Sequence, residues 1–133
     1  MPTEDFDLVM RTNVLGPLRL TLAFAHNVAK ARGAMVFLSS RMGSISGMSS
    51  SSGIAYRASK AALNAVVKAT SLELGKKGVR VMALHPGWVR TDMGGPQAML
   101  TPTESVAGMR HVIENASDKH GGFFDNTGAT IPW

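Results

Sequence analysis

Two short apolar runs, at residues 34–39 and 79–84, constrain the fold of this chain more than any other feature. A short apolar run of this kind is typical of a strand buried inside a parallel sheet. Between the two runs, residues from about 54 to 74 have the apolar spacing of a helix. Strand, helix, strand is the order of a βαβ unit, and ligands of such sheets lie beyond the carboxyl ends of the strands. The sequence therefore predicts an α/β fold.

A long helix is predicted before the first strand, from Thr3 to about residue 30. Thr3 can cap this helix, and the acidic residues that follow it suit the positive end of the helix dipole. Apolar residues then recur at helical spacing, with Asn13 on the same face and a kink expected at Pro17. Gly33 ends the helix. Because a buried asparagine needs hydrogen-bond partners, Asn13 either bonds to neighbouring backbone or serves a functional site.

The last third of the chain contributes one more helix and one more strand. Thr101 and Glu104 form a capping box with proline at the first helical position, which predicts a helix to about residue 116. Residues 121–124 are expected to open a last short strand. Together these elements predict part of a doubly wound, Rossmann-like parallel sheet with about three strands and about three helices. A chain of 133 residues with 44% hydrophobic residues is expected to form a single domain, residues 1–133.

Tyr56 and Lys60 are the leading candidates for chemistry, because they lie four residues apart in the predicted middle helix. Residues at that spacing share one helix face, with Cβ atoms roughly 5–6 Å apart, so the ammonium can lie beside the phenol. A nearby cation favours the ionised form of a tyrosine, which can then act as an acid or base near neutral pH. Taken alone, such a pair more often means one buried ring and one solvated amine.

Composition and charge exclude several classes of function. The chain has no cysteine, so a disulfide framework and thiol chemistry are excluded. Its net charge is +5, but the basic residues are scattered and aromatic residues make up 6%, so no nucleic-acid partner is expected. No apolar run approaches the ~18 residues of a membrane span, which predicts a cytoplasmic protein without a membrane partner. No metal site is expected, because the histidines lack the spacing of metal ligands and are assigned to the surface or to packing: His26, His85, His111 and His120.

The order and spacing of four short motifs resemble the short-chain dehydrogenases/reductases along essentially the whole chain. The motifs are Asn13-Val14-x-Gly16, the strand end Ser39-Ser40, Tyr56-x-x-x-Lys60 and Pro86-Gly87-x-Val89-x-Thr91. Three longer segments are similar to sniffer-type carbonyl reductases and bacterial C-factor proteins: residues 40–56, 84–95 and 121–133. The resemblance implies an oxidoreductase that uses NADP or NAD to transfer a hydride between a nicotinamide and a carbonyl or alcohol substrate.

The same resemblance implies a role for each candidate site residue. Tyr56 would supply or remove the proton of the substrate oxygen, while Lys60 would favour tyrosinate and bond the nicotinamide ribose. Ser40, with Ser39 as the alternative, would orient the substrate carbonyl, and Asn13 would order a water that connects to Lys60. The nicotinamide carboxamide would be held by four residues of the last motif: Pro86, Gly87, Val89 and Thr91.

One part of the family pattern is missing from the sequence. No glycine-rich turn of the kind that holds a dinucleotide pyrophosphate follows a strand and opens a helix, and residues 43–47 are interpreted as an active-site loop. The resemblance therefore covers the carboxyl-terminal half of the family fold and the reacting end of its site. The alternative is a truncated, catalytically silent fragment that oligomerises or binds a partner. In both cases a homo-oligomer is expected, through the first two long helices or through an exposed strand edge.

Overall fold

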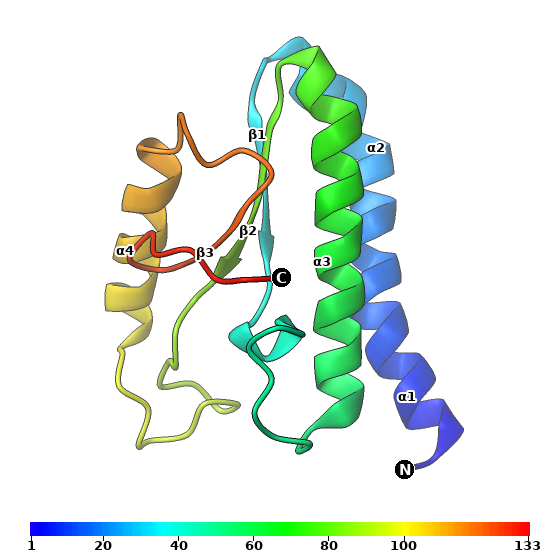
Figure 1. The fold of residues 1–133 in the computed structure, drawn as a ribbon, viewed down its shortest axis with the longest axis vertical. Coiled ribbons are helices and arrows are strands. Elements are labelled where there is room, and N and C mark those ends of the chain that lie inside the picture. The colour runs from blue at the N-terminus through cyan, green and yellow to red at the C-terminus, as the bar shows by residue number, and fades with distance from the viewer.

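The computed structural model describes residues 1–133 as a parallel three-stranded sheet with helices on both faces (Figure 1). The strand order is β1-β2-β3, and both pairings are parallel. In chain order the elements are α1 (Thr3–Met10), the π-helical turn η1 (Arg11–Leu15), α2 (Gly16–Lys30), β1 (Ala34–Leu38), the 3-10 turn η2 (Arg41–Gly43), α3 (Ile54–Leu74), the 3-10 turn η3 (Gly75–Lys77), β2 (Arg80–His85), α4 (Pro102–Glu114) and β3 (Phe123–Asp125). The predicted α/β class and parallel sheet are confirmed. No helix combines the length and the apolarity that crossing a membrane requires.

The two faces of β2 belong to two separate apolar cores. Val81 and Ala83 pack against α3 in a cluster that includes Val67. Met82 points to the opposite face and packs in a second cluster with Val112 of α4. Figure 1 shows the corresponding layers, with α2 and α3 side by side on one face of the sheet and α4 on the other. Because both faces of β2 are buried, its four central residues, 81–84, are all apolar rather than alternating with polar ones.

The long first helix that the sequence predicts is interrupted by η1. Pro17 has no N–H to donate to the carbonyl of Asn13, so the regular hydrogen-bond ladder cannot continue through this point. The irregularity expected at Pro17 therefore appears one turn earlier, as a widened turn that contains Asn13. The predicted cap at Thr3 is wrong: Pro2 occupies the N-cap position, and no side chain bonds to the first amides.

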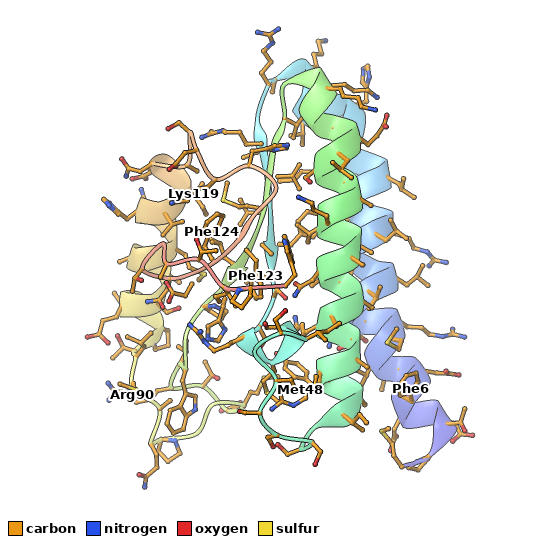
Figure 2. The ribbon with its side chains drawn as sticks, in the orientation of Figure 1. Phe6, Met48, Arg90, Lys119, Phe123 and Phe124 are labelled. Carbon is orange, nitrogen blue, oxygen red and sulfur yellow. The ribbon has the colours of Figure 1, made fainter.

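The capping box at the start of α4 is confirmed. Thr101 Oγ1 accepts a hydrogen bond from the Glu104 amide at 3.1 Å, and Glu104 Oε2 accepts one from the Thr101 amide at 2.7 Å. The helix ends two residues earlier than expected, at Glu114. β3 follows it, and Lys119 lies over the Phe124 ring of this strand, with Nζ 4.8 Å from the ring centre (Figure 2).

β1 is a free edge of the sheet. The Ser39 amide donates to the Leu84 carbonyl at 2.8 Å, so alternate residues of this strand face β2. The backbone groups of Ala34, Val36 and Leu38 therefore face away from the sheet. Beside this edge, α2 and β1 enclose an apolar hollow of about 370 Å³. This part of the surface combines unpaired strand amides with apolar side chains.

Candidate active site

The carboxyl ends of the three strands meet at one edge of the sheet, where a cavity of about 600 Å³ opens. Ser39 and Ser40 follow β1, His85 is the last residue of β2, and Asp125 is the last residue of β3. Ser39, Ser40 and His85 are among the 16 residues that line the cavity, and Asp125 is not. The other lining residues come from the turn after Ser40, the first turn of α3, the segment after β2 and the start of α4. In Figure 2, the loops that carry Met48 and Arg90 lie at this end of the molecule.

Tyr56 and Lys60 lie on one face of α3, as their spacing predicts. Lys60 Nζ is 5.7 Å from the centre of the Tyr56 ring. It donates a hydrogen bond to the carbonyl oxygen of Leu38, 3.0 Å away at the end of β1. Burial lowers the pKa of Lys60 below its ordinary value of 10.5. Tyr56 lines the cavity, whereas Lys60 is not among the lining residues and lies behind the ring.

The two serines after β1 have different partners. The Ser39 hydroxyl donates to Asn64 Oδ1 at 2.6 Å, and Asn64 in turn donates to the Gly43 carbonyl at 3.3 Å. Ser40 Oγ accepts a hydrogen bond from the Met42 amide at 3.1 Å, which leaves its own proton without a protein acceptor. Both serines are buried and both line the cavity. The Ser39 hydroxyl proton is therefore used in a hydrogen bond within the protein, while the Ser40 hydroxyl proton is available to a ligand.

Asn13 lies in the π-helical turn and bonds to α3 rather than to the cavity. Its Nδ2 donates to Ser59 Oγ at 3.0 Å, and the Ser59 hydroxyl donates to the Tyr56 carbonyl at 2.8 Å. Ser59 is fully buried. A short chain of hydrogen bonds therefore joins the first helices to the helical turn that carries Tyr56.

The loop after β2 is held in shape by its own side chains. Trp88 Nε1 donates to the Gly94 carbonyl at 2.8 Å, and Thr91 Oγ1 accepts from the Gly94 amide at 3.1 Å. Gly87 has a φ of +87°, and a Cβ there would lie 2.5 Å from the Leu100 side chain. Ser105 of α4 anchors the loop from the other side, because its hydroxyl donates to the Pro86 carbonyl at 2.6 Å.

Six of the eight predicted site residues line the cavity together: Ser40, Tyr56, Pro86, Gly87, Val89 and Thr91. Lys60 and Asn13 do not line it: Lys60 lies behind the Tyr56 ring, and Asn13 is joined through Ser59 to the backbone of the turn that carries Tyr56. The structure adds cavity residues that the sequence reasoning missed, above all His85 and Arg41. His85, which the sequence assigned to the surface or to packing, is half-buried and lines the cavity. Its position at the end of a strand, directly before Pro86, was the signal that pointed to the site.

His85 and its charged neighbours define the electrostatics of the strand ends. Burial lowers the pKa of His85, the Arg41 charge lowers it further, and the Asp125 carboxylate opposes this shift. His85 Nδ1 is buried without a hydrogen-bond partner. Burial alone would raise the pKa of Asp125, but bonds from Thr127 and Ala129 and the charge of Arg41 outweigh burial and hold it below its usual range. His85 is therefore neutral and Asp125 ionised near pH 7.

A family model described as short chain dehydrogenase matches residues 1–99 of the chain. The C-signal of Myxococcus xanthus is 45% identical over 131 residues, which is 97% of this chain and 79% of that protein. The 1-hydroxy-2-glutathionyl-2-methyl-3-butene dehydrogenase of a Rhodococcus species is 35% identical over 134 residues, which is 96% of this chain and 59% of that protein.

Solved structures of carbonyl reductases share the same fold. The carbonyl reductase Sniffer of D. melanogaster matches with a TM-score of 0.93 and 33% identity. An NADPH-bound carbonyl reductase from chicken fatty liver matches with a TM-score of 0.90 and 35% identity. Each similarity covers 100% of this chain and 59% of the solved chain, so the chain spans well under two thirds of these relatives.

Proposed function

Because this chain belongs to the short-chain dehydrogenase family, we propose that it carries the reacting end of an oxidoreductase site that uses NADP or NAD. The reaction is the reversible reduction of a carbonyl compound to an alcohol. When bound, the nicotinamide supplies or accepts the hydride. The single observation that carries the proposal is the convergence of Tyr56 and Ser40 on one cavity, with the Lys60 ammonium directly behind the phenol.

In this proposal Tyr56 handles the proton of the substrate oxygen. Its phenol gives a proton to the oxygen when a carbonyl is reduced and takes it back when an alcohol is oxidised. Lys60 supports the charged state of the phenol, because a cation in a partly desolvated position stabilises a nearby anion. The hydrogen bond from Lys60 to the Leu38 carbonyl supports this role, since it fixes the ammonium beside the ring.

Ser40 orients the substrate carbonyl. Its hydroxyl proton has no protein acceptor, whereas that of Ser39 is bonded to Asn64. A positioned hydroxyl donor stabilises the negative charge that grows on the carbonyl oxygen during reduction. We therefore assign this role to Ser40 and a structural role to Ser39.

The segment after β2 is suited to the nicotinamide end of the cofactor. Pro86, Gly87, Val89 and Thr91 all line the cavity, and the positive φ of Gly87 lets the backbone follow a path that a side chain would obstruct. These four residues would hold the carboxamide through backbone groups and the Thr91 hydroxyl, and Lys60 would bond the adjacent ribose. Because only this segment and Lys60 are assigned to the cofactor, the proposal covers the nicotinamide end of the cofactor and not its adenosine end.

Asn13 is proposed to support the site from behind. Its bond to Ser59 ties η1 to the second turn of α3, next to Lys60. A water ordered at this junction would connect Asn13 to Lys60 and give the ammonium a route for proton exchange.

The test of this function is a carbonyl-dependent loss of NADPH or NADH absorbance by the purified chain. A rise in the melting temperature with excess cofactor would report binding separately from turnover. If a chain that unfolds cooperatively shows neither the absorbance loss nor the rise in melting temperature, the proposal is contradicted.

The same proposal includes a cytoplasmic location and a single folding domain over residues 1–133. Cell fractionation would test the location, and a single calorimetric transition would test the domain.

A second candidate function, an oligomerising module without catalysis, is favoured by the edge of β1. The outward amides of this strand and the carbonyls of Ala34 and Val36 are a template for pairing with another chain, while the Leu38 carbonyl is already bonded to Lys60. The apolar hollow beside them would bury side chains of that chain. We propose that a second copy of this chain pairs with this edge, because its own β1 is a short apolar strand of the kind that an exposed sheet edge binds. The competing surface for self-association is the outer face of α2 and α3, where Leu22 and Leu72 are exposed.

A further inference from the structure

The site cavity carries one permanent charge. Of the 16 residues that line it, only Arg41 has a side chain that stays ionised across the neutral pH range. Its position follows from the fold, because Arg41 comes directly after Ser40 at the carboxyl end of β1. A positive group beside a hydroxyl donor favours ligands that bring a negative charge close to the reacting oxygen.

The guanidinium of Arg41 is only partly engaged by the protein. One nitrogen, Nη2, lies 3.4 Å from Oδ2 of Asp125, and the Arg41 side chain is 57% exposed. A charge-assisted bond of this type is usually shorter, near 2.7–2.9 Å, and often uses two nitrogens. The remaining N–H groups of the guanidinium are free to meet a ligand.

Asp125 is held in place by other groups. Its Oδ1 accepts hydrogen bonds from the Thr127 amide at 2.9 Å, the Thr127 hydroxyl at 2.6 Å and the Ala129 amide at 3.1 Å. These bonds fix the carboxylate in the turn after β3. Arg41 can therefore turn its free donors toward a ligand while Asp125 stays where it is and limits the direction in which the guanidinium points.

The outer wall of the same cavity is apolar. Trp88, Met93 and Val106 line it and are 53%, 84% and 51% exposed. Exposed apolar side chains at the wall of a cavity favour a ligand with an apolar body. The cavity thus combines an apolar wall with one cation and the hydroxyls of Ser40 and Tyr56.

We propose that Arg41 determines specificity at this site by selecting carbonyl compounds whose apolar body carries a carboxylate. The proposal rests on the proposed function, because it names the substrate class of the same cavity. A phosphate of the cofactor is also an anion, so the test separates the two sources of negative charge.

The test compares two ketones of nearly the same size and shape, the anion 4-acetylbenzoate and the neutral 4-acetylbenzamide. Binding is followed by quenching of Trp88 fluorescence, with Trp88→Phe to identify the signal, and turnover is followed with NADPH. The wild-type chain is expected to bind the acid roughly tenfold more tightly than the amide. Arg41→Gln should reduce this ratio to within about twofold, and Arg41→Lys should keep most of it.

Arg110→Gln is the matched control, because Arg110 also uses one nitrogen in an exposed ion pair, with Glu114, but lies outside the cavity. It should leave the acid-to-amide ratio at the wild-type value. Equal binding of the two ketones by the wild-type chain would overturn the proposal. So would an Arg41→Gln variant that binds NADPH more weakly but keeps the ratio. Acid-selective binding that depends on Arg41, without turnover of either ketone, would support this proposal and count against the proposed reduction.

Discussion

Lys60 Nζ donates a hydrogen bond to the Leu38 carbonyl, 3.0 Å away, and so ties the second turn of α3 to the end of β1. The bond holds a partly buried ammonium behind the ring of Tyr56. Burial makes this ammonium unfavourable, which is why the pKa of Lys60 is lowered. A charge that stays in such a position is expected to serve the chemistry of the site more than the stability of the fold.

Replacing Lys60 by methionine should therefore impair the reaction without weakening the fold. We expect Lys60→Met to reduce kcat by about 100-fold or more, while the free energy of unfolding at pH 7 falls by less than about 0.5 kcal/mol. Turnover assays and urea unfolding would measure the two effects. A loss of stability of several kcal/mol would show that Lys60 is mainly structural.

The same residue predicts a pH dependence of stability. Because the folded chain releases the Lys60 proton at lower pH, the unfolded chain binds more protons between the lowered pKa and the ordinary value of 10.5. In that window the free energy of unfolding should rise with pH. The contribution disappears in Lys60→Met, so the difference between the two unfolding profiles, measured at matched pH values, isolates it. Parallel profiles across this window would contradict the assignment.

The two serines after β1 should separate stability from chemistry. Ser39→Ala removes the donor to a buried Asn64 oxygen, which should cost about 1–3 kcal/mol of unfolding free energy and leave kcat close to the wild-type value. Ser40→Ala removes the free hydroxyl in the cavity and should lower kcat by about 100-fold, with a stability loss under about 1 kcal/mol. Each variant is the control for the other. The opposite pattern would transfer the carbonyl-orienting role to Ser39.

Gly87 should be sensitive to a single added methyl group. Gly87→Ala combines a φ of +87° with a close approach of the new Cβ to the Leu100 side chain and Asn126. Gly95 has a φ of +77° but nothing within 4 Å of such a Cβ, so Gly95→Ala reports the backbone effect alone. We expect losses of about 2 kcal/mol for Gly87→Ala and about 1 kcal/mol for Gly95→Ala. Thermal unfolding would compare them, and equal losses would show that the contact with Leu100 is unimportant.

Self-association should depend on one of two surfaces, which neighbouring residues of α2 distinguish. Leu20 lines the hollow beside β1 and is 61% exposed, while Leu22 is 71% exposed and does not line it. If a second copy pairs with the edge of β1, Leu20→Glu should convert the oligomer to a monomer in sedimentation experiments, and Leu22→Glu should not. Dissociation by Leu22→Glu alone would assign the contact to the outer helix face. A monomeric wild-type chain would contradict both.

Sequence reasoning succeeded where a feature depends on local spacing. Tyr56 and Lys60 share a face because of the helical repeat, and the Thr101 capping box depends on four consecutive residues. β2 was recognisable because burial on both faces makes its central residues, 81–84, apolar without interruption. The break near Pro17 was also expected, although its form as a π-helical turn depends on how the ladder adjusts around it.

What the sequence could not supply depends on residues far apart in the chain. Ser39 differs from Ser40 because of Asn64, which lies 25 positions away. The joint position of Arg41, His85 and Asp125 follows from the pairing of three strands, and no sequence spacing encodes it. The local environment of His85 likewise appears only when the strand ends come together.

The central claim, that Tyr56 transfers the proton of the substrate oxygen, is tested most directly by Tyr56→Phe. The change removes one hydroxyl and keeps the ring, so ketone binding, followed by Trp88 fluorescence, should stay within about threefold of the wild-type value. Turnover with NADPH should fall by about 100-fold to 10,000-fold. Wild-type turnover in Tyr56→Phe, measured as ketone-dependent NADPH oxidation, would contradict the account.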